Sequence, residues 1–133
     1  MLSPLRSLEN FGLLALRVAV ATSFLVHGMQ KWGMWSAPPA EMSSGMVALF
    51  RLLAVVEPLG AVAVLLGFLT PLAAAGLGII MLGAIYFKMF VFGAGFSGGW
   101  ELDLVLLSIC VALVTAGAGA WSLDALWGKS KKK

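Results

Sequence analysis

The chain has 133 residues, of which 61% are hydrophobic and only 11% charged, and its formal net charge is +3. An average soluble domain carries about 25% charged residues. This small number of charged residues cannot cover a folded surface with polar groups. The composition therefore excludes an ordinary soluble domain. We therefore expect lipid to be the solvent of this protein.

Four apolar stretches are long enough to cross a membrane, because a spanning helix needs about 20 predominantly apolar residues. They lie at residues 10–33, 46–69, 71–92 and 100–118. Together they use nearly the whole chain and leave no room for a soluble domain. We predict an all-α membrane protein with a single transmembrane domain over residues 1–133, folded as a four-helix bundle of up-down-up-down topology.

A short segment after the fourth stretch, residues 121–128, is predicted to lie in the membrane interface. It carries Trp121 and Trp127, and tryptophan is enriched at the boundary between membrane and water. A lysine run follows it at the end of the chain. No basic folded surface accompanies this run, so it favours solvent or anionic lipid over nucleic acid as its partner.

The distribution of basic residues predicts the orientation. Arg6 precedes the first stretch and the lysine run follows the fourth, whereas the loop between the second and third has no Lys or Arg. The positive-inside rule then places both termini in the cytoplasm, as an even number of spans requires. We expect a multi-pass protein of a bacterial-type cytoplasmic (inner) membrane.

Eight ionisable side chains lie inside or at the edges of the apolar stretches. A charge at the centre of a span costs about 2.5–3.5 kcal/mol on insertion scales, so such residues usually face a bundle interior, pair with each other or line a ligand path. They are Arg17, His27, Lys31, Arg51, Glu57, Lys88, Glu101 and Asp103. This set is the main indication of function in the sequence.

The first stretch places its ionisable residues on one face. At helical spacing Arg17, His27 and Lys31 fall within an arc of about 120°. Ala21 and Gly28 lie on the same arc, and small residues permit close helix approach in membranes. This face is therefore predicted to point into the bundle. The structural alternative is that Arg17 and Lys31 snorkel toward the two membrane surfaces.

The second stretch contributes the deepest acid, Glu57, which Pro58 follows directly. A proline cannot donate to the carbonyl four residues earlier, so the carbonyl of Ala54 is predicted to be a free acceptor. Arg17 is the cation nearest to Glu57 in depth, and we predict an ion pair between the two. The same pair would also serve a purely structural role.

The fourth stretch begins with two acids on nearly opposite faces. Glu101 shares its face with Ser108 and Thr115, so it is predicted to face the interior. Asp103 is predicted to pair with Lys88 or with water. With both termini cytoplasmic, the outer half of the bundle is predicted to hold a polar pocket whose floor is the pair of Arg17 and Glu57. The residues predicted to gather there are His27, Lys31, Arg51, Lys88 and Glu101.

The order and spacing of these residues resemble the DoxX family of small four-helix membrane proteins. The resemblance covers about residues 10–125 and departs mildly where Trp100 replaces a frequent Tyr and Ala118 a frequent Pro. The motifs that carry it are Leu16-Arg17, His27-Gly28-x-x-Lys31, Glu57 before Leu65-Leu66-Gly67, Gly99-Trp100-Glu101-Leu102 and the run from Gly117 to Asp124.

The resemblance implies a membrane subunit linked to redox chemistry. Some relatives are subunits of thiosulfate:quinone oxidoreductase, and others belong to complexes with soluble thiol or superoxide-handling partners.

The residues themselves are compatible with quinone binding, which needs apolar walls, aromatic contacts and a donor or acid near the carbonyls. Histidine suits a proton relay because it titrates near neutral pH, although a hydrogen-bonded packing role for His27 stays open. The ligand and proton-relay candidates are His27, Lys31, Glu57, Glu101 and Arg17. The candidate pocket walls are Trp32, Trp35, Phe87 and Trp100.

No other cofactor is predicted. The chain has one His, one Cys and no glycine-rich nucleotide loop, so we expect no haem, flavin, metal or nucleotide. Cys110 is interpreted as a small buried hydrophobe. The sequence shows no autonomous catalytic signature, and whether the protein is itself an enzyme stays open.

Three functions remain. The first is a quinone-binding membrane subunit of an oxidoreductase system with a soluble or membrane partner subunit. The second is a non-catalytic anchor or assembly partner of a redox complex. The third is a small proton-coupled transporter that works through Glu57, against which the expected Arg17 pair argues. Homo-oligomeric assembly is left open.

Overall fold

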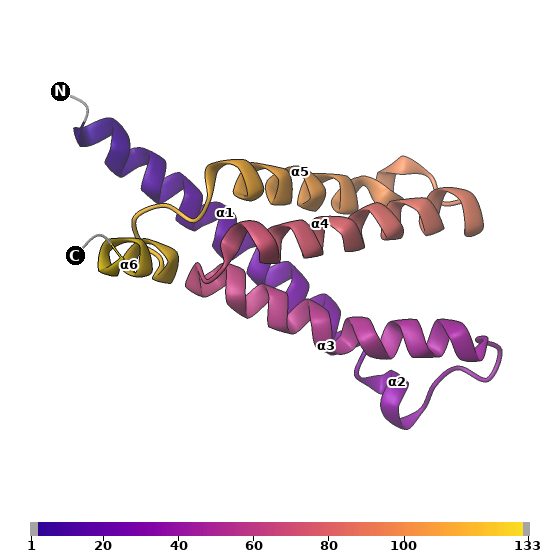
Figure 1. The fold of residues 1–133 in the computed structure, drawn as a ribbon. Coiled ribbons are helices and arrows are strands. Elements are labelled where there is room, and N and C mark those ends of the chain that lie inside the picture. The colour runs from indigo at the N-terminus through magenta and orange to yellow at the C-terminus, as the bar shows by residue number, and fades with distance from the viewer. Residues whose placement is uncertain (1–2, 132–133) are drawn as a thin grey trace.

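The computed structural model describes residues 3–131 and is helical apart from short connections (Figure 1). The long helices are α1 (Ser3–Gln30), α3 (Ser44–Leu66), α4 (Thr70–Tyr86) and α5 (Glu101–Ala116). The shorter ones are α2 (Gly33–Ser36) and α6 (Leu123–Ser130), and two π-helical segments, η1 (Phe87–Val91) and η2 (Phe96–Trp100), lie between α4 and α5. No strand occurs in the described part, and the prediction of an all-α fold is confirmed.

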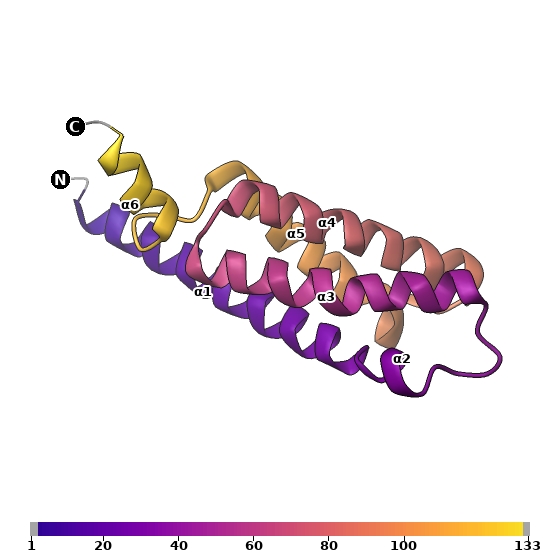
Figure 2. The same cartoon turned by 60° about the horizontal axis from the view of Figure 1, so that its bottom comes forward.

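Four helical segments are long and apolar enough to cross a membrane, namely Pro4–Ser36, Ser44–Leu66, Thr70–Val91 and Phe96–Ala116. They run up, down, up and down, and both ends of the described chain lie at the same end of the bundle (Figures 1 and 2). Many large apolar side chains are exposed, with Leu72 and Ile79 at 71% and 68%. Surfaces of this kind indicate contact with a lipid bilayer, and the protein is a multi-pass membrane protein.

The interior is apolar and joins all four long helices. Its members include Phe24, Val64, Leu77 and Leu113, each at most 1% exposed. Cys110 is also buried there, as predicted. The cluster lies toward the end that carries the termini, where α3 ends and α4 begins at a tight turn. From this turn the two helices diverge (Figure 1).

Close contact between α1 and α3 depends on Gly28. A Cβ atom at this position would lie 2.5 Å from Cδ and Cγ of Pro58, so only glycine permits this approach. Pro58 also frees the carbonyl of Ala54, as the sequence predicted. Trp32 takes this acceptor, since its indole Nε1 donates to Ala54 O at 3.0 Å.

The end of the bundle that carries the termini is closed by the segment between α5 and α6. The buried guanidinium of Arg17 donates to the carbonyls of Val64 and Leu65 at the end of α3, and to those of Ala118 and Trp121. Asp124 accepts from the backbone N–H groups of Leu69 and Thr70, where α4 begins, at 2.7 and 2.9 Å. A positive φ of 68° at Gly67 ends α3 at this junction. One charged side chain therefore joins the end of α3, where helix carbonyls lack their usual partners, to two carbonyls of the connection between α5 and α6.

Candidate functional site

A cavity of about 400 Å³ lies where α3 and α4 diverge, with α1 and η1 completing its wall. Its apolar lining comes from α3 (Met46, Leu49, Phe50 and Leu53), from α4 (Ile79, Ile80, Met81, Gly83 and Ala84) and from Phe87 and Phe92 near η1. Its polar lining consists of His27, Lys31, Glu57, Lys88 and Asp103. The volume falls in the range of small-molecule sites, which are mostly apolar with a few placed polar groups.

The first polar group of the cavity is an ion pair between Lys31, the residue directly after α1, and Glu57 on α3. Lys31 Nζ lies 3.1 Å from Glu57 Oε2, and it also donates to the carbonyl of His27 at 3.2 Å. Glu57 is 2% exposed. A carboxylate at this depth is tolerated because a cation lies against it.

The second polar group is an ion pair between η1 and α5. Lys88 Nζ lies 2.6 Å from Asp103 Oδ2, and Asp103 is 2% exposed. The ammonium donates to the carbonyl of Gly99 at 3.4 Å, and its contact with Asp103 is electrostatic without hydrogen-bond alignment. Lys88 belongs to a π-helical turn, a distortion that is frequent at functional sites. The expected pairing of Asp103 with Lys88 is confirmed.

The expected pair of Arg17 and Glu57 is wrong, and Arg17 is not part of the cavity. Side chains on a helix lean toward its N-terminus, so Arg17 reaches away from Glu57 and Lys31 reaches toward it. Arg17 lies opposite Val64, to whose carbonyl it donates at 2.9 Å. Glu57 is seven residues from Val64, about 10 Å along α3. The first turns of α1 project beyond the end of α3 (Figure 1). The position of a residue within its apolar stretch therefore did not predict how far α1 is shifted along α3.

The directions expected for the two acids of α5 are reversed. Glu101 is exposed, whereas Asp103 shares the buried face with Leu106, Cys110 and Leu113. Small and polar side chains predicted an interior face around Ser108 and Thr115, but both residues are exposed. These hydroxyls donate to carbonyls of their own helix, with Ser108 bonding to Leu104 O at 2.9 Å. Such hydroxyls are already satisfied and can face lipid.

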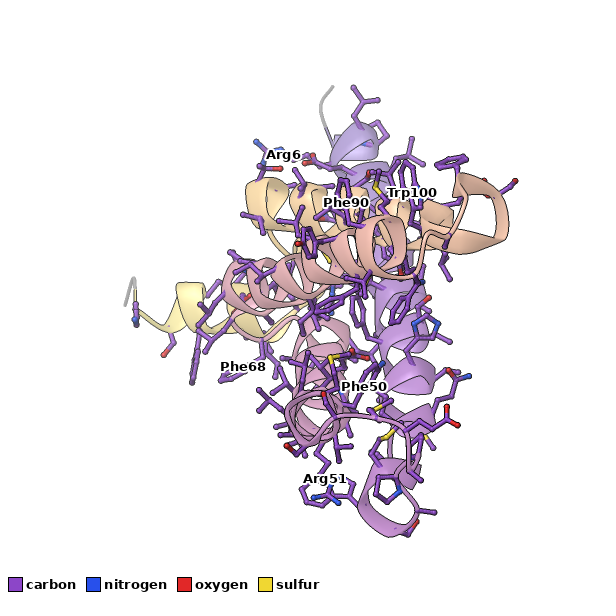
Figure 3. The ribbon with its side chains drawn as sticks, turned by 90° about the vertical axis from the view of Figure 1, so that its right-hand side faces the viewer. Arg6, Phe50, Arg51, Phe68, Phe90 and Trp100 are labelled. Carbon is purple, nitrogen blue, oxygen red and sulfur yellow. The ribbon has the colours of Figure 1, made fainter. Side chains whose placement is uncertain are left out.

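Of the four predicted wall residues, only Phe87 lines the cavity. Trp32 binds the carbonyl of Ala54 on α3, and Trp100 packs against Phe96 with ring centroids 4.8 Å apart. In Figure 3, Trp100 lies beside the connection between α4 and α5, away from Phe50 on α3.

Arg51, which was expected in the pocket, lies instead near α2 (Figure 3). Its guanidinium donates to the carbonyl of Met34 at 2.9 Å and lies 5.3 Å from the ring centroid of Trp35. Trp35 is thus a partner of Arg51 and not a wall of the cavity. This group fastens the loop after α1 to the start of α3.

His27, Lys31 and Glu57 are the ligand and proton-relay candidates that the structure places on the cavity. The sequence pattern favoured Glu101 over Asp103 as the acid that faces the interior. The spacing that could have identified Asp103 is that of one helix face, which it shares with Leu106, Cys110 and Leu113. The sequence also did not single out Phe50 and Phe92. Phe92 lies beyond a π-helical segment, where a regular helical period cannot predict the direction of a side chain.

The cavity can hold an apolar molecule with a few hydrogen-bond acceptors. Ile79 and Phe92, two of its lining residues, are 68% and 65% exposed on the surface that contacts lipid. A ligand dissolved in the bilayer could therefore enter from the side. Among residues 3–131, no group of three His, Cys, Asp or Glu side chains is placed to hold a metal ion.

The chain was compared with known proteins and families. The family model described as DoxX matches residues 12–93, which contain most of α1, all of α3 and α4, and most of the cavity lining. No curated protein and no solved structure matches the chain. The match extends over more than half of the 133 residues and includes the motifs up to Gly67, whereas those at residues 99–102 and 117–124 lie beyond it. The chain therefore belongs to the DoxX family.

Proposed function

We propose that this protein is the membrane subunit of a quinone-linked oxidoreductase system and binds quinone, or a small redox ligand of similar shape, in the cavity between α1, α3, α4 and η1. One observation carries the proposal. Two buried carboxylates, each with a lysine, and one histidine face an otherwise apolar cavity of about 400 Å³. Charges inside the hydrocarbon layer are costly, and their usual role is functional.

The two lysines can bind the carbonyl oxygens of a quinone. An ammonium has three donors and no acceptor. In the described structure, Lys31 directs donors at Glu57 and at the carbonyl of His27, and Lys88 is held by Asp103 and by the carbonyl of Gly99. Lys31 therefore keeps one donor for a ligand, and Lys88 keeps at least one. Lys31 belongs to the α1 side of the cavity and Lys88 to the η1 side, which suits a ring with two carbonyl groups.

The cavity also carries groups that can move protons. Reduction of a quinone to a quinol takes up two electrons and two protons, and His27, Glu57 and Asp103 are the titratable acids or bases on the wall. Histidine is the side chain whose ordinary titration range includes neutral pH. In this proposal the partner oxidoreductase supplies the electrons, and these side chains supply or receive the protons at the ring oxygens.

The proposed orientation places both termini in the cytoplasm of a bacterial-type inner membrane and the cavity in the outer half of the bundle. The distribution of Lys and Arg along the chain supports it. The two ends of the described chain lie together, and the cavity lies toward the opposite end of α3 and α4. Quinone dissolved in the bilayer would reach the cavity past Ile79 and Phe92.

The proposal is tested by quinone content and quinone binding of the protein purified in a mild detergent. We expect quinone in its lipid extract, and we expect Asp103→Asn to reduce both the content and the affinity for an added short-chain quinone. The matched control is Glu101→Gln, because this acid lies two residues away and is exposed. Folded protein without quinone, whose melting temperature does not respond to quinone analogues, would leave the anchor role instead.

A further inference from the structure

Helix α6 carries an apolar stripe with lysines beside it. Leu123, Leu126 and Trp127 share one face at helical spacing, and they are 41%, 62% and 56% exposed. Lys129 and Lys131 fall on the two flanks of this stripe. An apolar stripe flanked by cations is typical of a helix that lies on an anionic lipid surface.

A groove of about 370 Å³ lies beside this stripe. It is lined by Leu66, the last residue of α3, and by residues 120–123 together with Leu126. Its lining is mainly apolar, so it suits an acyl chain better than a soluble ligand. Lys129 follows Leu126 by three positions, which are neighbouring positions on a helix surface. A lipid with its chain against Leu126 would thus have its phosphate near Lys129.

The place of α6 in the fold agrees with a position at the membrane surface. Trp127 packs against Phe68, which belongs to the turn between two spanning helices, with ring centroids 5.3 Å apart. Such a turn lies where a span leaves the bilayer. Figure 3 shows α6 projecting sideways from the bundle beside Phe68. Asp124 fixes the start of α6, because its carboxylate accepts from the backbone N–H groups of Leu69 and Thr70, where α4 begins.

We propose that α6 and the groove beside it form a binding site for an anionic phospholipid of the leaflet at this end of the bundle. The acyl chain packs against Leu66 and Leu126, and the phosphate binds Lys129, with Lys131 adding to the positive field. The chain continues with Lys132 and Lys133, which strengthens the charge complementarity. This site is separate from the quinone cavity and does not depend on it.

The test uses the whole protein in vesicles of phosphatidylcholine and phosphatidylglycerol in which one lipid at a time carries bromine on its acyl chains. Bromine quenches nearby tryptophan, and the difference between the wild type and Trp127→Phe isolates Trp127. A lysine near an anionic surface contributes about 1 kcal/mol to the binding free energy, which corresponds to a preference of about fivefold for anionic over neutral lipid. We therefore expect brominated phosphatidylglycerol to be enriched about fivefold or more at Trp127 over brominated phosphatidylcholine at equal mole fraction.

A variant with Gln in place of Lys129, Lys131, Lys132 and Lys133 should keep the quenching but lose the preference, and high salt should weaken the preference in the wild type. Arg6→Gln is the control, because it removes an exposed charge elsewhere on the chain and should change nothing. Equal quenching by the two lipids at low salt would overturn the proposal. So would protection of Trp127 from both lipids, because α6 would then lie in water.

Discussion

The junction around Arg17 gives the sharpest prediction about stability. Arg17→Met keeps a long side chain at this position but removes the guanidinium that donates to four carbonyl groups. Val64 O retains a backbone partner, since it also accepts from the N–H of Gly67 at 3.1 Å. The carbonyls of Leu65, Ala118 and Trp121 lose the donor that Arg17 gives them. An unsatisfied buried acceptor costs about 1–3 kcal/mol, and the hydrogen bonds to Leu65 O and Trp121 O are only partly buried, so these two count toward the low end. We therefore expect a loss of about 3–6 kcal/mol in the free energy of unfolding.

The measurement is reversible unfolding in mixed micelles. Arg17→Lys should recover part of the loss, because an ammonium still donates but cannot reach four acceptors from a single point. Arg6→Met is the control, since Arg6 is exposed on the same helix, and it should stay within about 0.5 kcal/mol of the wild type. A loss below about 1 kcal/mol for Arg17→Met would refute the claim that this side chain holds the helix ends together.

The other predictions concern packing, the first ion pair and topology. Gly28→Ala should lower the free energy of unfolding by about 1–3 kcal/mol because its Cβ meets Pro58, whereas Gly12→Ala, with open space around it, should not lower it. Lys31→Met should cost about 3 kcal/mol because it leaves Glu57 charged and alone, and adding Glu57→Leu should restore most of this loss. Additive costs in that double variant would show that the two side chains do not interact. A reporter fused after the last residue should be active only in the cytoplasm, and activity outside it would reverse the orientation.

The fold could be predicted because lipid as the solvent leaves few alternatives. Four apolar stretches of spanning length and short connections between them determine an antiparallel bundle. The inward face of α1 was also predictable, since its charged and small residues recur at helical spacing: Arg17 and Gly28 are buried, and Lys31 is partly so. Composition and periodicity therefore carry the architecture.

The ion pairs were harder to predict because they depend on quantities that composition does not contain. Arg17 and Glu57 belong to inward faces, yet the axial register of α1 against α3 and the lean of the side chains select Lys31 as the partner of Glu57. On α5, internal hydrogen bonds of Ser108 made a face toward lipid look like an interior face. Register, side-chain direction and local hydrogen bonding decide such details, and only coordinates supply them.

The most direct test of quinone binding in the cavity fills the cavity. Gly83 lies in its lining, and a Cβ atom there would meet nothing within 4 Å, so Gly83→Leu can occupy the space without a clash. Gly76→Leu is the matched control, because it lies two turns earlier on the same face of α4, with open space around it and outside the cavity lining. Binding of a short-chain quinone is measured by calorimetry on protein in lipid nanodiscs. The account predicts that Gly83→Leu abolishes binding while Gly76→Leu binds like the wild type. Unchanged binding by folded Gly83→Leu would contradict it.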